Sequence, residues 1–126
     1  MLKIMLAAVD RENLSPFAQG LAANTDVELT WVDSGASALR RAAEEPPHLV
    51  VVGEELGDMS GLDLVNSLLR LNAFINTAVI SALSAEDFHE AGEGLGIMVQ
   101  LSPRPGPAHA NEVLTRLSKI TSFSAA

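Results

Sequence analysis

The chain has 126 residues and a mass of 13.3 kDa, which suits one domain, and it contains no cysteine, which excludes disulfides, thiolate metal ligands and cysteine nucleophiles. Its 16 acidic and 8 basic residues give a net charge of -8, which disfavours binding to nucleic acid because neutralisation of phosphates supplies most non-specific affinity. No apolar run approaches the ~20 residues of a membrane-spanning helix, and the N-terminus lacks a signal-type segment. We therefore expect a cytoplasmic protein that contacts neither nucleic acid nor a membrane.

The chain up to Pro46 predicts two units of a strand followed by a helix. Residues 2–9 form an apolar run, and residues 27–32 alternate enough to form a strand near the edge of a sheet. Ser15 followed by Pro16 predicts an N-cap and the first position of a helix, and Ser34 with Gly35 predicts the start of another. We expect strands over 2–9 and 27–32, and helices over 16–23 and 36–44.

The rest of the chain predicts three further strands, each followed by a helix. Residues 49–52 are a continuous apolar run, which is typical of a buried central strand, and residues 78–83 and 97–101 are the other two candidates. Ser60 and Ser84 predict N-caps, the second as part of a capping box with Asp87. We expect one helix from Ser60, one from Ser84 to about Gly92, one over 108–120, and a frayed tail over 121–126.

This alternation of strands and helices predicts an α/β fold. Right-handed crossover connections place helices on both faces of a parallel sheet, so five such units favour a doubly wound, five-stranded parallel sheet. The sequence shows no repeat, linker or shift in composition that would divide it. We expect a single domain over residues 1–126.

Residues 47–62, PHLVVVGEELGDMSGL, mark the place where function is expected, because the carboxyl ends of parallel strands face the ligand crevice. This segment resembles, without a gap, the pattern apolar-apolar-apolar-Asp-x-x-Met-Pro-x-Met-Asp-Gly of response-regulator receiver domains. Residues 34–39, SGASAL, are similar to the Asn-Gly-x-Glu-Ala-Leu turn of that family. The resemblance covers about residues 3–120. It implies a flavodoxin-like sheet of order 2-1-3-4-5, with Gly53 at the position of the phosphoacceptor aspartate.

The same resemblance places inert residues at the other phosphotransfer positions of the family. The acidic pair that helps to bind Mg²⁺ falls on Ala8 and Val9. The Ser or Thr that ends the fourth strand falls on Leu83, with the hydroxyls of Ser84 next to it and of Ser81 within the expected strand. The lysine after the fifth strand falls on Ser102, and the resemblance implies a cis peptide bond between Ser102 and Pro103. We therefore expect the receiver scaffold without its phosphotransfer chemistry.

Three acidic side chains keep a second hypothesis open. Asp10 lies one position after the expected acidic pair, and Glu54 and Glu55 follow Gly53. We expect both glutamates to be solvated, because neither stands at the backbone position of the nucleophile, and a constitutive mimic of phosphate would need the acid at residue 53 itself. The second hypothesis is an atypical receiver that binds Mg²⁺ or accepts phosphate at one of these three acids.

The leading hypothesis is a receiver-like signalling module that acts without phosphorylation, through contact with a protein partner or through dimerisation, and without catalysis, cofactor or metal. Receivers commonly bind partners through the fourth helix, fifth strand and fifth helix, which the resemblance places at residues 85–93, 97–101 and 108–118. The expected contact residues are Phe88, His89, Met98 and Val99, of which Val99 falls on the aromatic residue that reports phosphorylation in the family. A third hypothesis is a sensor that binds an uncharged small molecule in the crevice near Ala8, Gly53 and Ser102.

Overall fold

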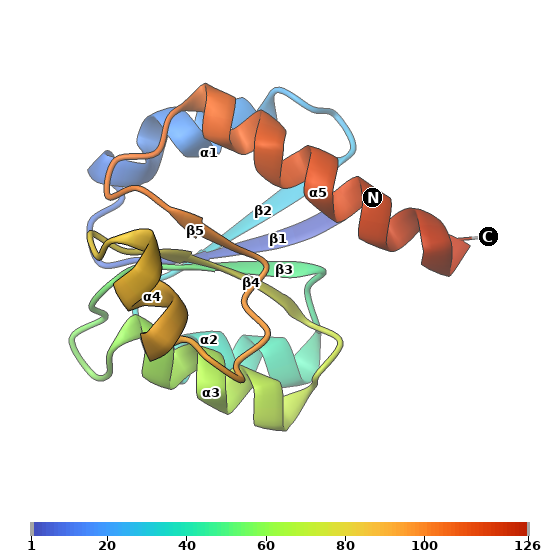
Figure 1. Cartoon of the computed structure of the whole chain (residues 1–126). Coiled ribbons are helices and arrows are strands. Elements are labelled where there is room, and N and C mark those ends of the chain that lie inside the picture. The colour runs from blue at the N-terminus through green and yellow to red at the C-terminus, as the bar shows by residue number, and fades with distance from the viewer. Residues whose placement is uncertain (1, 126) are drawn as a thin grey trace.

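The computed structural model describes residues 2–125 and the side chains of residues 2–120. It contains the predicted α/β fold, a five-stranded parallel sheet in the order β2-β1-β3-β4-β5 (Figure 1). The strands are β1 (Leu2–Ala7), β2 (Val27–Val32), β3 (Leu49–Val52), β4 (Asn76–Ile80) and β5 (Val99–Leu101). The helices are the 3-10 turn η1 (Glu12–Leu14), α1 (Ser15–Ala22), α2 (Gly35–Glu44), α3 (Gly61–Leu71), α4 (Ala85–Ala91) and α5 (Pro107–Ala125).

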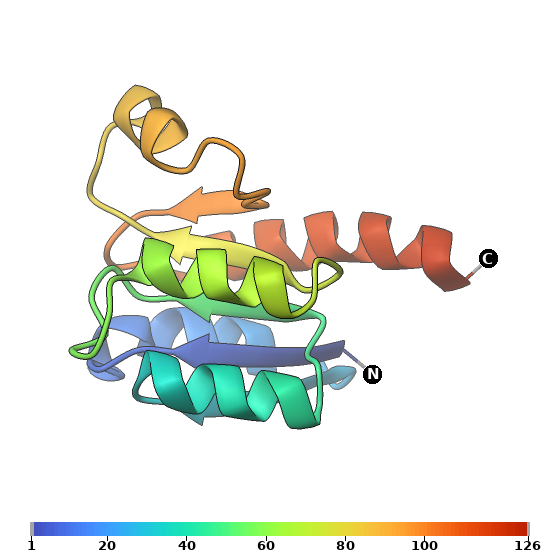
Figure 2. The same ribbon diagram turned by 90° about the horizontal axis from the view of Figure 1, so that it is seen from below.

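Helices cover both faces of the sheet, as right-handed crossovers require. α1 and α5 pack on one face, α2 and α3 pack on the other, and α4 stands apart from α3, toward the β5 edge of the sheet (Figures 1 and 2). The alternation of side chains along β1 sorts the core into two parts. Ile4 and Leu6 join the core under α1 and α5, whereas Met5 and Ala7 join the core under α2 and α3.

Three of the four serines that predict helix starts do cap helices. The hydroxyl oxygens of Ser34, Ser60 and Ser84 accept the backbone N–H three residues ahead, at 3.1, 3.2 and 3.1 Å. The prediction for Ser15 is wrong. Because η1 leads directly into α1, the backbone of Ser15 is already helical (φ -56°, ψ -49°), and Leu14 precedes the helix without a side-chain cap.

The predicted ends of three strands are wrong by a few residues. β4 begins at Asn76 and ends at Ile80 instead of covering 78–83, because its pairing starts where Asn76 and Thr77 lie opposite Leu49 and Val50 of β3. β1 ends at Ala7 rather than residue 9, and β5 covers only residues 99–101. Pairing with a neighbouring strand, which local composition does not encode, therefore sets these limits.

The last helix is longer than predicted. α5 continues to Ala125, so residues 121–125 are helical where we expected a frayed tail, and Ala126 lies outside the described residues. Alanine and serine there neither break a helix nor provide a stop signal such as glycine or proline. Between residues 2 and 125, no helix combines the length and the apolar character needed to cross a membrane.

Candidate functional site

The carboxyl edge of the sheet brings together three of the four positions that the sequence singles out, and Ser81 takes the place expected for Leu83. Ala7 lies opposite Val52, so Ala8 and Gly53 follow neighbouring strands, and the Gly53 N–H donates to the Ala7 carbonyl at 2.8 Å. On the other side of β3, the Ser81 N–H donates to the carbonyl of Leu101, the last residue of β5, at 3.0 Å. The residues that follow β1, β3, β4 and β5 therefore line one edge, where α/β sheets bind ligands.

Gly53 leaves room for a side chain. An added Cβ would lie 3.3 Å from the Ala7 carbonyl oxygen and 3.7 Å from the Leu56 side chain, so its neighbours would need to move only slightly. Gly53 is not among the glycines with positive φ, so the backbone does not require glycine here. By contrast, a Cβ on Gly61 would lie 2.2 Å from the Gly53 carbonyl oxygen. Neither the backbone conformation nor a severe Cβ clash therefore requires glycine at residue 53.

The other predicted positions lie at this edge with one exception. Ala8 is buried beside Gly53, and Val9 is 60% exposed. The assignment of Leu83 is wrong in position, because β4 ends at Ile80, so the buried Ser81 and not the 45% exposed Leu83 follows the strand.

The prediction of a cis peptide bond before Pro103 is also wrong. Ser102 follows β5 and is exposed, and residues 2–125 contain no cis peptide bond. The expectation rested on the resemblance alone, and the trans form is the ordinary isomer even before proline.

The Asp10 carboxylate forms hydrogen bonds with residues of its own loop. Its carboxylate accepts the backbone N–H of Glu12 at 3.1 Å and the side-chain amide of Asn13 at 3.0 Å, which fixes the start of η1. These contacts engage both carboxylate oxygens of Asp10, which is the first acidic residue after β1. Within residues 2–125, no group of three His, Asp or Glu side chains is arranged to hold a metal ion.

A pocket of about 220 Å³ opens at this edge. Its apolar wall includes Ala8, Gly53 and Pro103, and its acidic wall includes Asp10, Glu54 and Glu55. A crevice therefore lies where we predicted one beside Ala8 and Gly53, with Pro103 in its lining in place of Ser102.

Glu54 is not simply solvated, which corrects our expectation. Its Oε2 accepts the backbone N–H of Ala82, in the loop that connects β4 and α4, at 2.9 Å. In the same loop, the Gln100 side-chain amide donates to the Leu83 carbonyl at 2.8 Å and to the Ser81 carbonyl at 3.3 Å. The β4–α4 loop is therefore held by side chains from β5 and from the loop after β3.

Asp58 makes a second contact between loops. Leu56 and Met59 close a tight turn, with Gly57 at φ 82°, and this turn carries Asp58 to the start of α2. The Asp58 carboxylate accepts the N–H groups of Gly35 at 2.9 Å and of the next residue at 3.0 Å. These hydrogen bonds lower the pKa of Asp58 below its ordinary value, because they stabilise the charged form.

The predicted contact surface of α4, β5 and α5 is hollowed in two places. A groove of about 450 Å³ separates α4 from β5, and one of about 620 Å³ lies between β5 and α5, with Met98 lining both. His89 is exposed, and Met98 and Val99 are half-buried. Phe88 does not fit the prediction of a contact residue: it is only 8% exposed, because it is the side chain that packs α4 onto the core.

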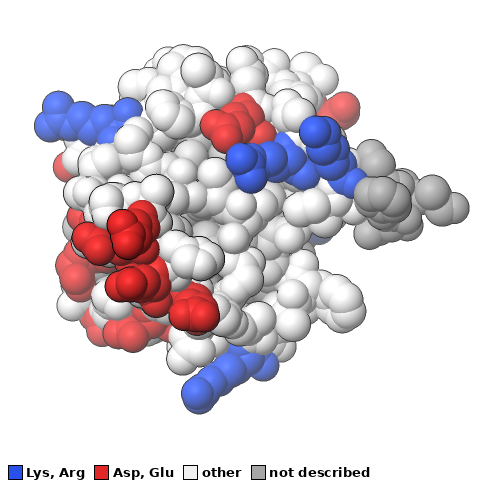
Figure 3. Space-filling view, viewed as in Figure 1, with Lys and Arg blue, Asp and Glu red and all other residues white. Residues whose placement is uncertain are grey.

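The charges on this surface are separated. Acidic side chains gather over α4, and basic ones lie next to an acidic patch over α5, with an uncharged strip between the two groups (Figure 3). The exposed acids on and after α4 are Glu86, Asp87, Glu90 and Glu93, and no lysine or arginine lies between residues 83 and 103. The exposed bases on α5 are Arg116 and Lys119, and Arg116 pairs with Glu112 at 3.2 Å.

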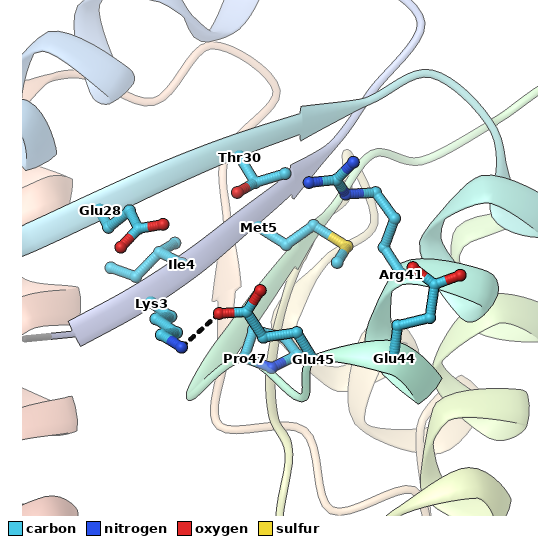
Figure 4. A pocket seen from close by; sticks show the side chains of 9 residues that line it. All are labelled: Lys3, Ile4, Met5, Glu28, Thr30, Arg41, Glu44, Glu45 and Pro47. Carbon is cyan, nitrogen blue, oxygen red and sulfur yellow. Dashed lines mark hydrogen bonds and ion pairs between the residues drawn. The ribbon is translucent and has the colours of Figure 1, made fainter.

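A second pocket of about 220 Å³ lies beside β1, β2 and the end of α2 (Figure 4). Lys3 pairs there with Glu45, and this contact raises the pKa of Lys3 and lowers that of Glu45. Both side chains are well exposed, at 40% and 66%, so the pair is screened by water and contributes little to stability. We regard this pocket as a charged surface recess.

No model of a known protein family matches the sequence, and no curated protein matches it. Solved structures match nearly the whole chain. The receiver domain of AraT, a response regulator from Geobacillus stearothermophilus, superposes with a TM-score of 0.86 at 16% identity, covering 99% of this chain and 98% of that one.

Two other neighbours agree. The N-terminal domain of an uncharacterised protein from Wolinella succinogenes gives a TM-score of 0.83 at 18% identity, with 98% and 99% of the two chains covered. The chemotaxis response regulator CheY4 of Vibrio cholerae gives 0.81 at 15% identity, with 93% and 98% covered. This chain therefore has the receiver-domain fold of two-component response regulators.

Proposed function

We propose that this chain is a receiver-like signalling module that works without phosphorylation and acts through contact with another protein molecule. The observation that carries this proposal is the edge of the sheet at Gly53. The backbone there matches the receiver fold, yet the residue after β3 has no side chain and the residue after β1 is the buried Ala8. We expect no catalysis.

Phosphoryl transfer to a carboxylate needs a free oxygen nucleophile, a cation and a positive group near the transferred phosphoryl. Of the three acids that line the pocket beside Gly53, Asp10 accepts two hydrogen bonds and Glu54 accepts the N–H of Ala82, while Glu55 lies two residues after the position of the nucleophile. Ser102 supplies a hydroxyl where the family has an ammonium group. None of the three requirements is met by a side chain at its usual place.

The test is incubation with acetyl phosphate and Mg²⁺, followed by intact-mass analysis, with an active receiver domain as positive control. We expect no gain in mass. A stable gain of one phosphoryl group would refute the proposal, and peptide mapping to Asp10, Glu54 or Glu55 would establish instead the atypical receiver.

We propose a second copy of this chain as the partner, bound through α4, β5 and α5. The separation of charge on this surface supports the choice, because a two-fold axis along β5 would place the acidic α4 of each copy against the basic α5 of the other. The half-buried Met98 and Val99 would lie near the axis and supply apolar contact.

Charge reversal tests this dimer. The variant Arg116→Glu/Lys119→Glu makes both helices acidic, and the variant Glu86→Lys/Glu90→Lys makes both basic. We expect each variant alone to weaken self-association at least about tenfold, because like charges then face each other across the axis. An equimolar mixture should restore the dimer, which sedimentation velocity measures.

The homodimer would be refuted if the equimolar mixture stays monomeric. It would also be refuted if the wild-type chain is monomeric at about 0.1 mM. Reversal variants that associate as well as the wild type would place the interface elsewhere. All four substituted side chains are exposed, so folding is expected to be unchanged, and circular dichroism provides that control.

One observation favours a second candidate function. The pocket of about 220 Å³ at Gly53 sets the apolar Ala8, Gly53 and Pro103 against the acids Asp10, Glu54 and Glu55, which suits a small uncharged ligand that also donates hydrogen bonds. Thermal-shift screening of metabolite fractions tests this sensor. A shift that disappears when Ala8→Leu fills the pocket would support it.

A further inference from the structure

We propose that Glu54 is a positioning residue that fixes the β4–α4 loop, and with it α4, in the arrangement that presents the interaction surface. The inference deepens the function proposed above, since it rests on α4 being part of that surface. It assigns a role to a carboxylate that we had expected to be merely solvated.

α4 packs weakly against the rest of the molecule. Phe88 is the one buried residue of this seven-residue helix, whereas α3 buries four residues. α4 also stands apart from α3 and reaches beyond the layer of helices on that face (Figure 2). Its position therefore depends on the single anchor Phe88 and on residues 81–84, which join it to β4.

The polar groups of this loop are bound by side chains. Ser81 Oγ accepts the N–H of Leu83 at 3.1 Å, which is a contact within the loop. Two side chains from outside it bind the loop, in addition to the backbone bond from Ser81 to Leu101: Glu54 accepts the N–H of Ala82 at 2.9 Å, and Gln100 donates to the carbonyls of Leu83 at 2.8 Å and Ser81 at 3.3 Å. Of these contacts, the one to Glu54 is charge-assisted and hence the stronger type of hydrogen bond.

The backbone of Glu54 is itself held by a hydrogen bond. Its carbonyl accepts the N–H of Gly61, the first residue of α3, at 3.0 Å. Glu54 thus connects the start of a well-packed helix to the loop that carries a poorly packed one. Glu55 is the natural comparison, since it is also exposed and follows immediately, and its side chain has no hydrogen bond among those described for residues 2–120.

A fixed β4–α4 loop favours binding of a partner to α4. A loop that samples several conformations would spread the acids of α4 over several positions, and a partner would then bind only the competent fraction of molecules. A loop held in one conformation avoids that loss. Because the acceptor is a side chain of the unmodified sequence, this arrangement needs no modification of the chain.

The experiment compares Glu54→Ala, Glu54→Gln and Glu55→Ala. In Glu54→Ala we expect exchange of the Ala82 amide, and of the amides of α4, to rise about threefold to tenfold by NMR. Glu54→Gln keeps a carbonyl acceptor and should fall between this variant and wild type. Glu55→Ala should match wild type. The urea midpoint should be nearly the same in all three, because Glu54 is exposed.

The second readout is self-association. Glu54→Ala should weaken the dimer about threefold or more, while Glu55→Ala leaves it unchanged. Equal exchange at Ala82 in Glu54→Ala and wild type would overturn the inference, and so would an equal rise in Glu55→Ala. If wild type does not dimerise, the homodimer proposed above fails, while the exchange comparison still decides whether Glu54 holds the loop.

Discussion

α3 and α4 lie toward the same face of the sheet and begin in the same way, yet they are held by different forces. Ser60 caps α3 and Ser84 caps α4, with nearly equal hydrogen-bond lengths of 3.2 and 3.1 Å. α3 then buries Leu64 and three further residues, whereas α4 buries only Phe88. α3 is therefore fixed mainly by apolar packing, and α4 mainly by Phe88 and the loop before it. Most of the surface of α4 is left free to contact a partner.

The largest expected difference between the two helices is in the stability lost when a buried side chain is truncated to alanine. Leu64→Ala should lower the free energy of unfolding by about 3 kcal/mol, because Leu64 is fully buried under α3. Phe88→Ala should cost less than about 2 kcal/mol, since the edge position lets α4 relax or open locally. Urea unfolding measures both. A Phe88→Ala loss equal to that of Leu64→Ala would show that α4 is as much part of the core as α3.

The next difference is in the glycines at the ends of the two helices. Gly61→Ala should cost about 2–3 kcal/mol, because its Cβ would meet the Gly53 carbonyl oxygen at 2.2 Å and the backbone would have to move. Gly92→Ala should cost less than about 1 kcal/mol, because its Cβ would meet the movable end of the Ile97 side chain at 2.9 Å. Urea unfolding checks this pair, and equal costs would argue against the difference in packing.

The two serine caps offer a finer test. Removal of either cap by substitution with alanine should cost its helix about 1 kcal/mol. We expect Ser60→Ala to lower global stability by that amount, since α3 unfolds with the core. Ser84→Ala should instead raise amide exchange in α4 and change global stability less. If Ser84→Ala lowers global stability as much as Ser60→Ala, α4 does not open separately from the core.

The smallest effect concerns Asp58, in the loop that leads into α3. Its pKa in the folded chain is lowered by the N–H groups of Gly35 and Ala36, so the unfolded chain binds the proton more readily. The resulting stabilisation is complete above the ordinary pKa of 3.8 and is lost as pH falls through the lower folded value. The difference in melting temperature between wild type and Asp58→Asn should therefore shrink by a few degrees or less in that window. A difference that does not change with pH would rule out this titration.

Much of the fold follows from local signals, and much of the site does not. The caps at Ser34, Ser60 and Ser84 are predictable because each hydrogen bond closes over three residues. The contact from Glu54 to Ala82 spans 28 residues, so nothing near Glu54 in the sequence announces it.

The same reason explains two other residues that the sequence did not reveal. Asp58 reaches Gly35 across 23 residues, and Gln100 reaches Leu83 across 17. Gln100 had one available signal, since it is the only polar side chain in the three residues of β5. The resemblance to receivers supplied the position of Gly53, but it misplaced the residue after β4 because Leu83 was counted from an apolar run and not from strand pairing.

The neutral residues at the junction of β1 and β3 have a consequence for how the domain responds to its surroundings. Where several carboxylates crowd one edge of a sheet, their mutual repulsion opposes folding until a cation relieves it. Ala8 and Gly53 place no buried charge there. The backbone in this part of the molecule should therefore keep one shape in solutions with and without divalent ions, and a chelator should leave thermal unfolding where it was.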